Sequence, residues 1–128
     1  MTFKIRIISN PNIGLPMLAI SENKRLDVDN PVQHVTDDVS VLVAPELFGK
    51  NFVVHQIDKA IAEKRSLIIL TNNATAINYV GNLKDDGKLT NDNFEFVVCG
   101  KNYTLDDEGF LVGVDGSYWP YGIFDADR

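Results

Sequence analysis

The chain has one cysteine and two histidines among its 128 residues. A single cysteine cannot form an internal disulfide, which excludes a disulfide-stabilised secreted scaffold. The soft metal ligands are therefore His34, His55 and Cys99, and none is spaced from another as in a known metal site. The sequence predicts no metal site, no catalytic triad and no cofactor.

Long apolar segments are also missing. The longest runs, 39–44 and 67–70, fall far below the roughly 20 residues that a bilayer span requires. Lys4 and Arg6 interrupt the short apolar stretch at the start, which is unlike a signal-peptide core. We therefore expect a cytoplasmic protein that has no membrane partner.

Positive charge is scarce. Lys and Arg number 12 against 18 Asp and Glu, which gives a formal net charge of −6. Four basic residues lie within 1–25, whereas 85–128 holds ten acidic residues and three basic ones. The basic set is too small for a phosphate track, so no nucleic-acid partner is expected. The acidic half favours a protein partner with a basic surface, unless its Asp residues serve only to form turns.

Known phosphate, calcium and glycosidase patterns are absent. Gly49-Lys50 precedes a predicted helix, but the earlier glycine and the following hydroxyl residue of a phosphate loop are missing. Adjacent acid pairs such as Asp37-Asp38 point to opposite faces of a strand or lie solvated in turns. The sequence therefore indicates a protein without a recognisable catalytic motif.

The middle of the chain has the clearest structural pattern. Val39–Val43 and Leu67–Leu70 are short apolar runs typical of buried strands. Between them, 51–65 carries Val54, Ile57 and Ile61 on one helical stripe, widened by Val53 and Ala60, with Asn51 as the predicted cap. Strand, helix and strand in this order predict a parallel βαβ crossover.

The flanking segments predict antiparallel structure. Residues 3–7 alternate as in a strand, and Leu15–Ile20 is expected to return as the second strand of a hairpin. A long connection follows over 21–38, with a short strand at 32–35. Later segments predict a helix over 74–83, strands over 94–99, 110–114 and 118–124, and a buried Cys99. The expected fold is a single compact α+β domain spanning 1–128. It has a mixed sheet with one parallel crossover and antiparallel hairpins at both ends.

Two segments could form a binding site. Ligands of open α/β sheets lie beyond the carboxyl ends of strands, which selects Glu46, Thr71, Asn72 and Asn73. The same residues could instead end a strand and cap the next helix.

The second segment is aromatic. The final predicted strand places aromatic rings on both of its faces, and an edge strand buries only one face completely. We therefore select Tyr118, Trp119 and Tyr121, rimmed by Asp115 and Asp125, as a partner-binding surface. The alternative is a last strand that closes the core.

These observations favour a small acidic, non-catalytic protein that binds another macromolecule. Inhibitors or adaptors of the type encoded by bacteria and their viruses fit this description. One alternative is a small-molecule binder or minor enzyme that uses the strand-end residues. Another is a subunit of a homo-oligomer, in which the aromatic segment mediates self-association.

Overall fold

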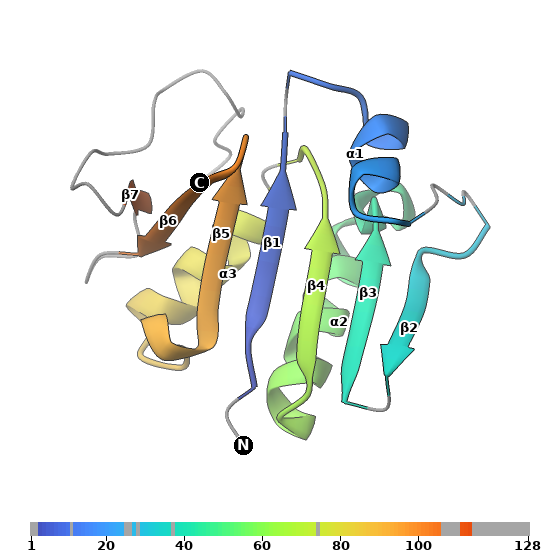
Figure 1. The fold of residues 1–128 in the computed structure, drawn as a ribbon. Coiled ribbons are helices and arrows are strands. Elements are labelled where there is room, and N and C mark those ends of the chain that lie inside the picture. The colour runs from blue at the N-terminus through green and yellow to red at the C-terminus, as the bar shows by residue number, and fades with distance from the viewer. Residues whose placement is uncertain are drawn as a thin grey trace.

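The computed structural model describes residues 3–10, 12–24, 27, 29–36, 38–73, 75–105 and 111–113. These residues form one seven-stranded sheet with the order β2-β3-β4-β1-β5-β6-β7 (Figure 1). The strands are β1 (Ile5–Ser9), β2 (Val32–Thr36), β3 (Val39–Val43), β4 (Ser66–Leu70), β5 (Phe94–Val98), β6 (Lys101–Leu105) and β7 (Leu111–Gly113). The helices are α1 (Leu15–Ser21), α2 (Lys50–Glu63) and α3 (Thr75–Asp85), with short 3-10 turns η1 (Pro45–Phe48) and η2 (Asn91–Asn93). The predicted α+β class with a mixed sheet is confirmed.

The centre of the sheet is parallel and its two margins are antiparallel. Strands β3, β4, β1 and β5 run in the same direction, whereas β2 and β6 run against their neighbours β3 and β5. Antiparallel pairs therefore lie at both ends of the sheet. Parallel pairing extends further than the single predicted crossover, because β1 pairs with both β4 and β5.

The prediction of a hairpin strand that pairs with β1 is wrong. Leu15–Ile20 lies within helix α1, not in a strand. Pro16 occupies the first turn of this helix, where a missing backbone N–H costs nothing. Leu18 and Ala19 are buried, as expected for the inner side of a short amphipathic helix. Without a neighbouring hairpin strand, β1 takes its partners from distant parts of the chain.

Helix α2 forms close to its predicted position, with its buried stripe turned slightly. Its fully buried residues are Val53, Ile57 and Ala60, whereas Val54 and Ile61 are only half-buried. The helix begins after Gly49 without a side-chain cap, so the prediction of Asn51 as the cap is wrong.

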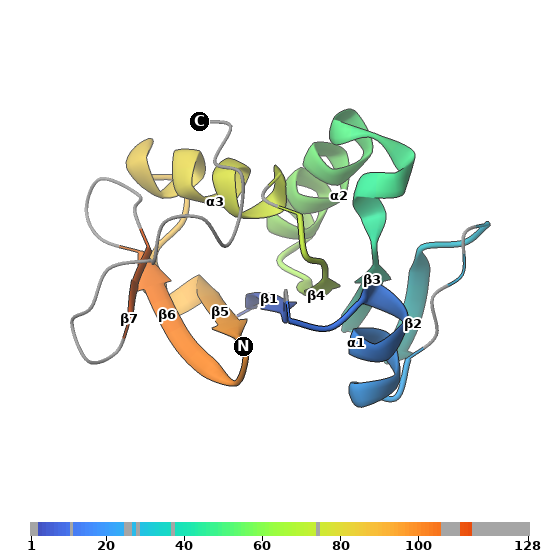
Figure 2. The same cartoon turned by 90° about the horizontal axis from the view of Figure 1, so that it is seen from above.

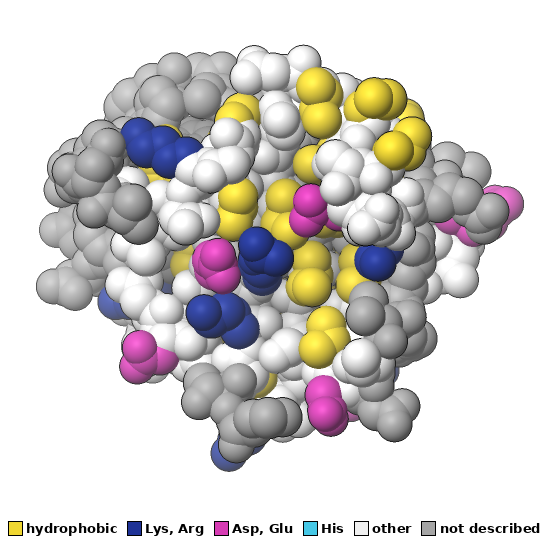
Figure 3. Space-filling model, viewed as in Figure 1, with side chains coloured by type: hydrophobic (Ala, Val, Ile, Leu, Met, Phe, Trp, Pro, Cys, Tyr) yellow, Lys and Arg dark blue, Asp and Glu magenta, His cyan; other side chains and the backbone are white. Residues whose placement is uncertain are grey.

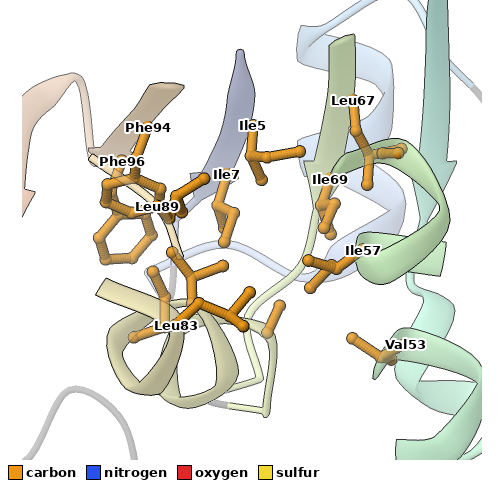
Figure 4. Packing of buried hydrophobic residues seen from close by; sticks show 14 of the residues in the cluster. Ile5, Ile7, Val53, Ile57, Leu67, Ile69, Leu83, Leu89, Phe94 and Phe96 are labelled. Carbon is orange, nitrogen blue, oxygen red and sulfur yellow. The ribbon is translucent and has the colours of Figure 1, made fainter. Parts of the chain in front are cut away.

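The main core lies between the sheet and two helices. Helices α2 and α3 cover one face of the sheet, and α1 lies on the other (Figure 2). The larger cluster contains Ile5, Ile7, Phe94 and Phe96 from the strands, packed against Ile57 and other helix residues (Figure 4). Phe94, Phe96 and Val98 share the buried face of β5, as their alternation predicts.

Two local irregularities shape the sheet. The β5–β6 turn consists of Cys99 and Gly100, both at positive φ (51° and 80°), which is the backbone of a type I′ hairpin turn. Cys99 is exposed there, so its prediction as a core residue is wrong. At the opposite edge, the β2–β3 register shifts between His34 and Thr36.

No helix in the described ranges is long and apolar enough to cross a membrane.

Candidate functional site

The candidate site lies where the four parallel strands end. Strands β3, β4, β1 and β5 all point toward the same edge of the sheet (Figure 1). Helix α1, which follows β1, and helix α3, which follows β4, lie on opposite faces of the sheet (Figure 2). Because β1 and β4 are neighbours, their exit loops separate and form a topological switch point, the usual ligand position in open α/β sheets.

Glu46 and Thr71 meet at the ends of β3 and β4. The Thr71 hydroxyl donates a hydrogen bond of 2.8 Å to Oε1 of Glu46 and accepts one of 3.0 Å from the Asn73 backbone N–H. The Ser9 hydroxyl, at the end of β1, donates to the Thr71 carbonyl. Ser9 and Thr71 are almost fully buried, so these bonds satisfy groups that water does not reach. These hydrogen bonds therefore form a chain that runs from Ser9 through Thr71 to Glu46.

Burial changes the acidity of Glu46. Its side chain is half-buried on η1, and desolvation raises the pKa of its carboxyl group. Hydrogen bonds from its own backbone and from Thr71 lower this pKa and offset part of the rise. Ala44, two residues before Glu46, has a left-handed backbone (φ 51°), an uncommon conformation for a residue other than glycine. Such strained positions are often found beside functional groups.

Asn72 joins the two exit loops of the switch point. Its Oδ1 accepts a hydrogen bond of 2.8 Å from the Asn10 backbone N–H, and its Nδ2 donates one of 3.0 Å to the Ile13 carbonyl. Both halves of the amide are thus engaged with the loop that follows β1. Asn72 positions the site, because it holds the β1 and β4 loops together.

Asn73 has the alternative role that the sequence analysis allowed, at the start of the next helix. Its Oδ1 accepts a hydrogen bond of 2.8 Å from the Thr75 backbone N–H at the start of α3. This is the contact of a helix-capping side chain. The structure therefore brings Glu46, Thr71 and Asn72 into one network and gives Asn73 a role at the helix terminus.

Sequence reasoning missed three residues at the same edge: Asn10, Asn12 and Cys99. The Cys99 sulfur lies 3.2 Å from Oδ1 of Asn10 and 3.5 Å from Nδ2 of Asn12. Asn10 and Asn12 were missed because residues 10–14 were assigned to a hairpin turn, and Cys99 was missed because it was predicted to be buried in the core. The signal was present in the two asparagines that directly follow an apolar strand, a pattern shared with the end of β4.

The polar edge has two separate halves. Glu46 follows β3 and Cys99 follows β5, with β4 and β1 between them. Three strand spacings of about 4.8 Å separate the ends of β3 and β5 by about 14 Å. A small ligand cannot contact Glu46 and Cys99 at once, so the two side chains do not form one catalytic pair.

Other candidate residues do not join this site. Asp115, Tyr118, Trp119, Tyr121 and Asp125 lie outside the described residues. Among the described residues, no three His, Cys, Asp or Glu side chains group together as metal ligands would.

A hollow of about 230 Å³ lies at the opposite edge of the sheet, where β4 begins. Ser40, Lys59 and Arg65 are among its lining residues. The Arg65 guanidinium is held by the Ser40 hydroxyl at 2.8 Å and by the Thr36 carbonyl at 3.1 Å. None of the residues selected from the sequence as binding-site candidates is among its lining residues.

Comparison with known proteins adds no assignment. No protein-family model matches the chain, and no curated protein or solved structure matches it either.

Proposed function

We propose that the protein binds a small polar molecule at the carboxyl ends of β3, β4 and β1. The observation that supports this function is the switch point between β1 and β4, with the half-buried Glu46 carboxyl beside it. Ligands of open α/β sheets lie beyond a switch point of this kind, and polar side chains there fix the orientation of a ligand.

The chemistry of the site favours a ligand with hydrogen-bond donors. Oε1 of Glu46 already accepts the Thr71 hydroxyl, and the carboxyl group has further lone pairs available to a ligand. An amine or hydroxyl group would supply the matching donor. A cationic amine also suits the carboxylate charge, which a phosphate would oppose.

Binding, not catalysis, is the role that the geometry supports. Thr71 uses its hydroxyl hydrogen on Glu46, and Asn72 uses its amide to hold two loops. Cys99 lies three strands away from Glu46 along the sheet. Within the described ranges, the site thus offers one carboxyl and a rigid polar frame, without a nucleophile beside them.

Backbone-amide NMR with a library of small amines and polyols tests the proposal. A ligand should shift the amide signals of Glu46, Thr71 and Asn72, and Glu46→Gln should weaken its binding about tenfold or more. Glu63→Gln is the matched control, because Glu63 is exposed at the far end of α2. Shifts confined to Ser40, Lys59 and Arg65 would assign binding to the other edge and contradict the proposal.

The macromolecule-binding hypothesis made from the sequence stays a prediction. Its residues, Tyr118, Trp119 and Tyr121 with Asp115 and Asp125, fall outside the described ranges. It does not conflict with a ligand site at the strand ends, because the two hypotheses use different residues.

A further inference from the structure

The two faces of the sheet are covered unequally. Among the described residues, 17 buried residues form the larger hydrophobic cluster on the side of α2 and α3, whereas the cluster on the α1 side contains six. Figure 2 shows the two helices on one face of the sheet and α1 on the other. Helix α1 has seven residues and is about 10 Å long, which is too short to cover four strands. Parallel sheets are normally covered on both faces. The described helices therefore leave part of the α1 face open.

The open part, here called the open strip, consists of Lys4, Arg6, Ile68, Glu95 and Val97. Arg6 lies directly opposite Ile68 on one side and Glu95 on the other, so these side chains share one face. Ile68 and Val97 are half-buried at the margin of the smaller cluster. Charged and apolar side chains lie side by side in the middle of this face (Figure 3).

The charges of the open strip are not balanced. Nε of Arg6 and Nζ of Lys4 lie 3.6 and 3.9 Å from the same oxygen of Glu95. Nε of Arg6 is shielded from solvent and has no hydrogen-bond partner among the residues that the structure describes. Two cations thus share one carboxylate, and the strip has a net positive charge in a chain whose net charge is −6. A negatively charged group is the complement of this strip.

Helix α1 offers apolar side chains and one carboxylate, Glu22, to such a contact, and Lys24 follows Glu22 in the chain. Its outward side chains Met17 and Ile20 are 57% and 62% exposed, although both are apolar. Glu22 caps the carboxyl end of the helix, where the backbone dipole is also negative. Ile68 and Val97 of the open strip pack against the cluster that contains Leu18 and Ala19, so α1 and the strip occupy the same side of the sheet.

We propose that a second copy of this chain covers the open strip, in a two-fold symmetric dimer in which α1 of each copy packs on the strip of the other. A two-fold interface requires each copy to present both halves of the contact, and this face does so. When the two-fold axis passes between α1 and the open strip, the α1 helices of both copies lie in one layer between the sheets of the two copies. Met17 and Ile20 contact Ile68 and Val97 of the other copy, and Glu22 faces the other copy's cations.

The size of the protein in solution tests the dimer. Light scattering coupled to size-exclusion chromatography should give twice the chain mass of 14.3 kDa. Met17→Glu should weaken dimerisation about tenfold or more, because it introduces a carboxylate into an apolar contact. Leu47→Glu is the matched control, since Leu47 is equally exposed (57%) but lies on η1, outside the interface. Circular dichroism confirms that each variant remains folded.

A charge exchange distinguishes contact between copies from contact within one copy. Arg6→Glu and Glu22→Arg should each give monomers alone, because each places like charges across the interface. An equimolar mixture of the two variants should form a mixed dimer, because both contacts then join opposite charges. A monomeric parent, a dimer broken by Leu47→Glu instead of Met17→Glu, or a mixture that stays monomeric would each overturn the proposal. These variants leave Glu46, Thr71 and Asn72 unchanged, so the ligand site is tested independently.

Discussion

The Thr71 hydroxyl donates a 2.8 Å hydrogen bond to the carboxyl of Glu46, which joins the carboxyl ends of two neighbouring parallel strands. Although 25 residues separate them in sequence, the βαβ crossover places them side by side. This contact fixes the acidic side chain that the described residues contribute to the candidate site.

The first prediction concerns pH. Burial raises the pKa of Glu46 in the folded protein above its ordinary value of 4.5, so the folded state holds this proton more tightly than the unfolded state. The contribution of Glu46 to stability is therefore greatest below pH 4.5 and falls as pH rises through the folded pKa. Urea unfolding at pH 4 and pH 7 should show Glu46→Gln gaining stability relative to the parent at the higher pH. A difference between the two proteins that does not change with pH would contradict this assignment.

The second prediction concerns Asn72. Asn72→Ala removes both hydrogen bonds that hold the β1 loop and should lower the free energy of unfolding by about 1–3 kcal/mol. Hydrogen exchange at the Asn10 amide should become faster, because this N–H loses its acceptor. Asn82→Ala, at an exposed position on α3, is the control and should change stability by less than about 0.5 kcal/mol.

The third prediction concerns the contact of α2 with the sheet. Ile57 has no exposed surface, and Ile57→Ala should cost about 2–5 kcal/mol in urea unfolding. His55 is exposed on the same helix, so His55→Ala should have little effect. Equal midpoints for Ile57→Ala and the parent would mean that the buried side of α2 is misplaced.

The fourth prediction uses a matched pair of lysines. Lys64 ends α2 in the left-handed conformation (φ 53°), where glycine is unstrained, so Lys64→Gly should raise stability by about 0.5–1 kcal/mol. Lys59→Gly, within the same helix, should lower stability by about 1 kcal/mol. Thermal melts of the two variants should shift in opposite directions.

The fifth prediction tests the aromatic segment. Trp119 is the only tryptophan, so quenching of the protein's tryptophan fluorescence by acrylamide reports on this side chain alone. If it anchors a partner, Trp119→Ala should leave the fold intact and weaken that binding by about 2 kcal/mol or more. Complete shielding of Trp119, together with unfolding of the variant, would instead make it a core residue.

Patterns of apolar residues predicted the strands and the helix whose formation depends on residues near one another in the sequence. The apolar run Val39–Val43 became β3 with the same limits, and alternation identified the buried face of β5. Helix α2 followed from the spacing of its apolar side chains. Glu46, Thr71 and Asn72 were found because a single crossover is enough to place two strand ends at one edge.

The partners of β1 could not be predicted in this way. Its apolar residues fit a hairpin and a central parallel strand equally well, and the register with β5 joins Ser9 to Val98. No nearby residue specifies so distant a pairing. The assignment of 15–20 as a strand failed for a related reason, since the proline there suits a helix start as well as an edge strand. Asn10 and Cys99 were missed as a consequence of both.

The central position of β1 also determines when the chain can fold during its synthesis. Ile7 leaves the ribosome before its two neighbours in the sheet, Ile69 and Phe96. Both edges of β1 remain unpaired until β4 has emerged, and one edge until β5 has emerged, and unpaired apolar strands are prone to aggregate. A nascent chain that stalls between β4 and β5 exposes one full edge of its central strand. Such an interrupted product is therefore a natural substrate for chaperones.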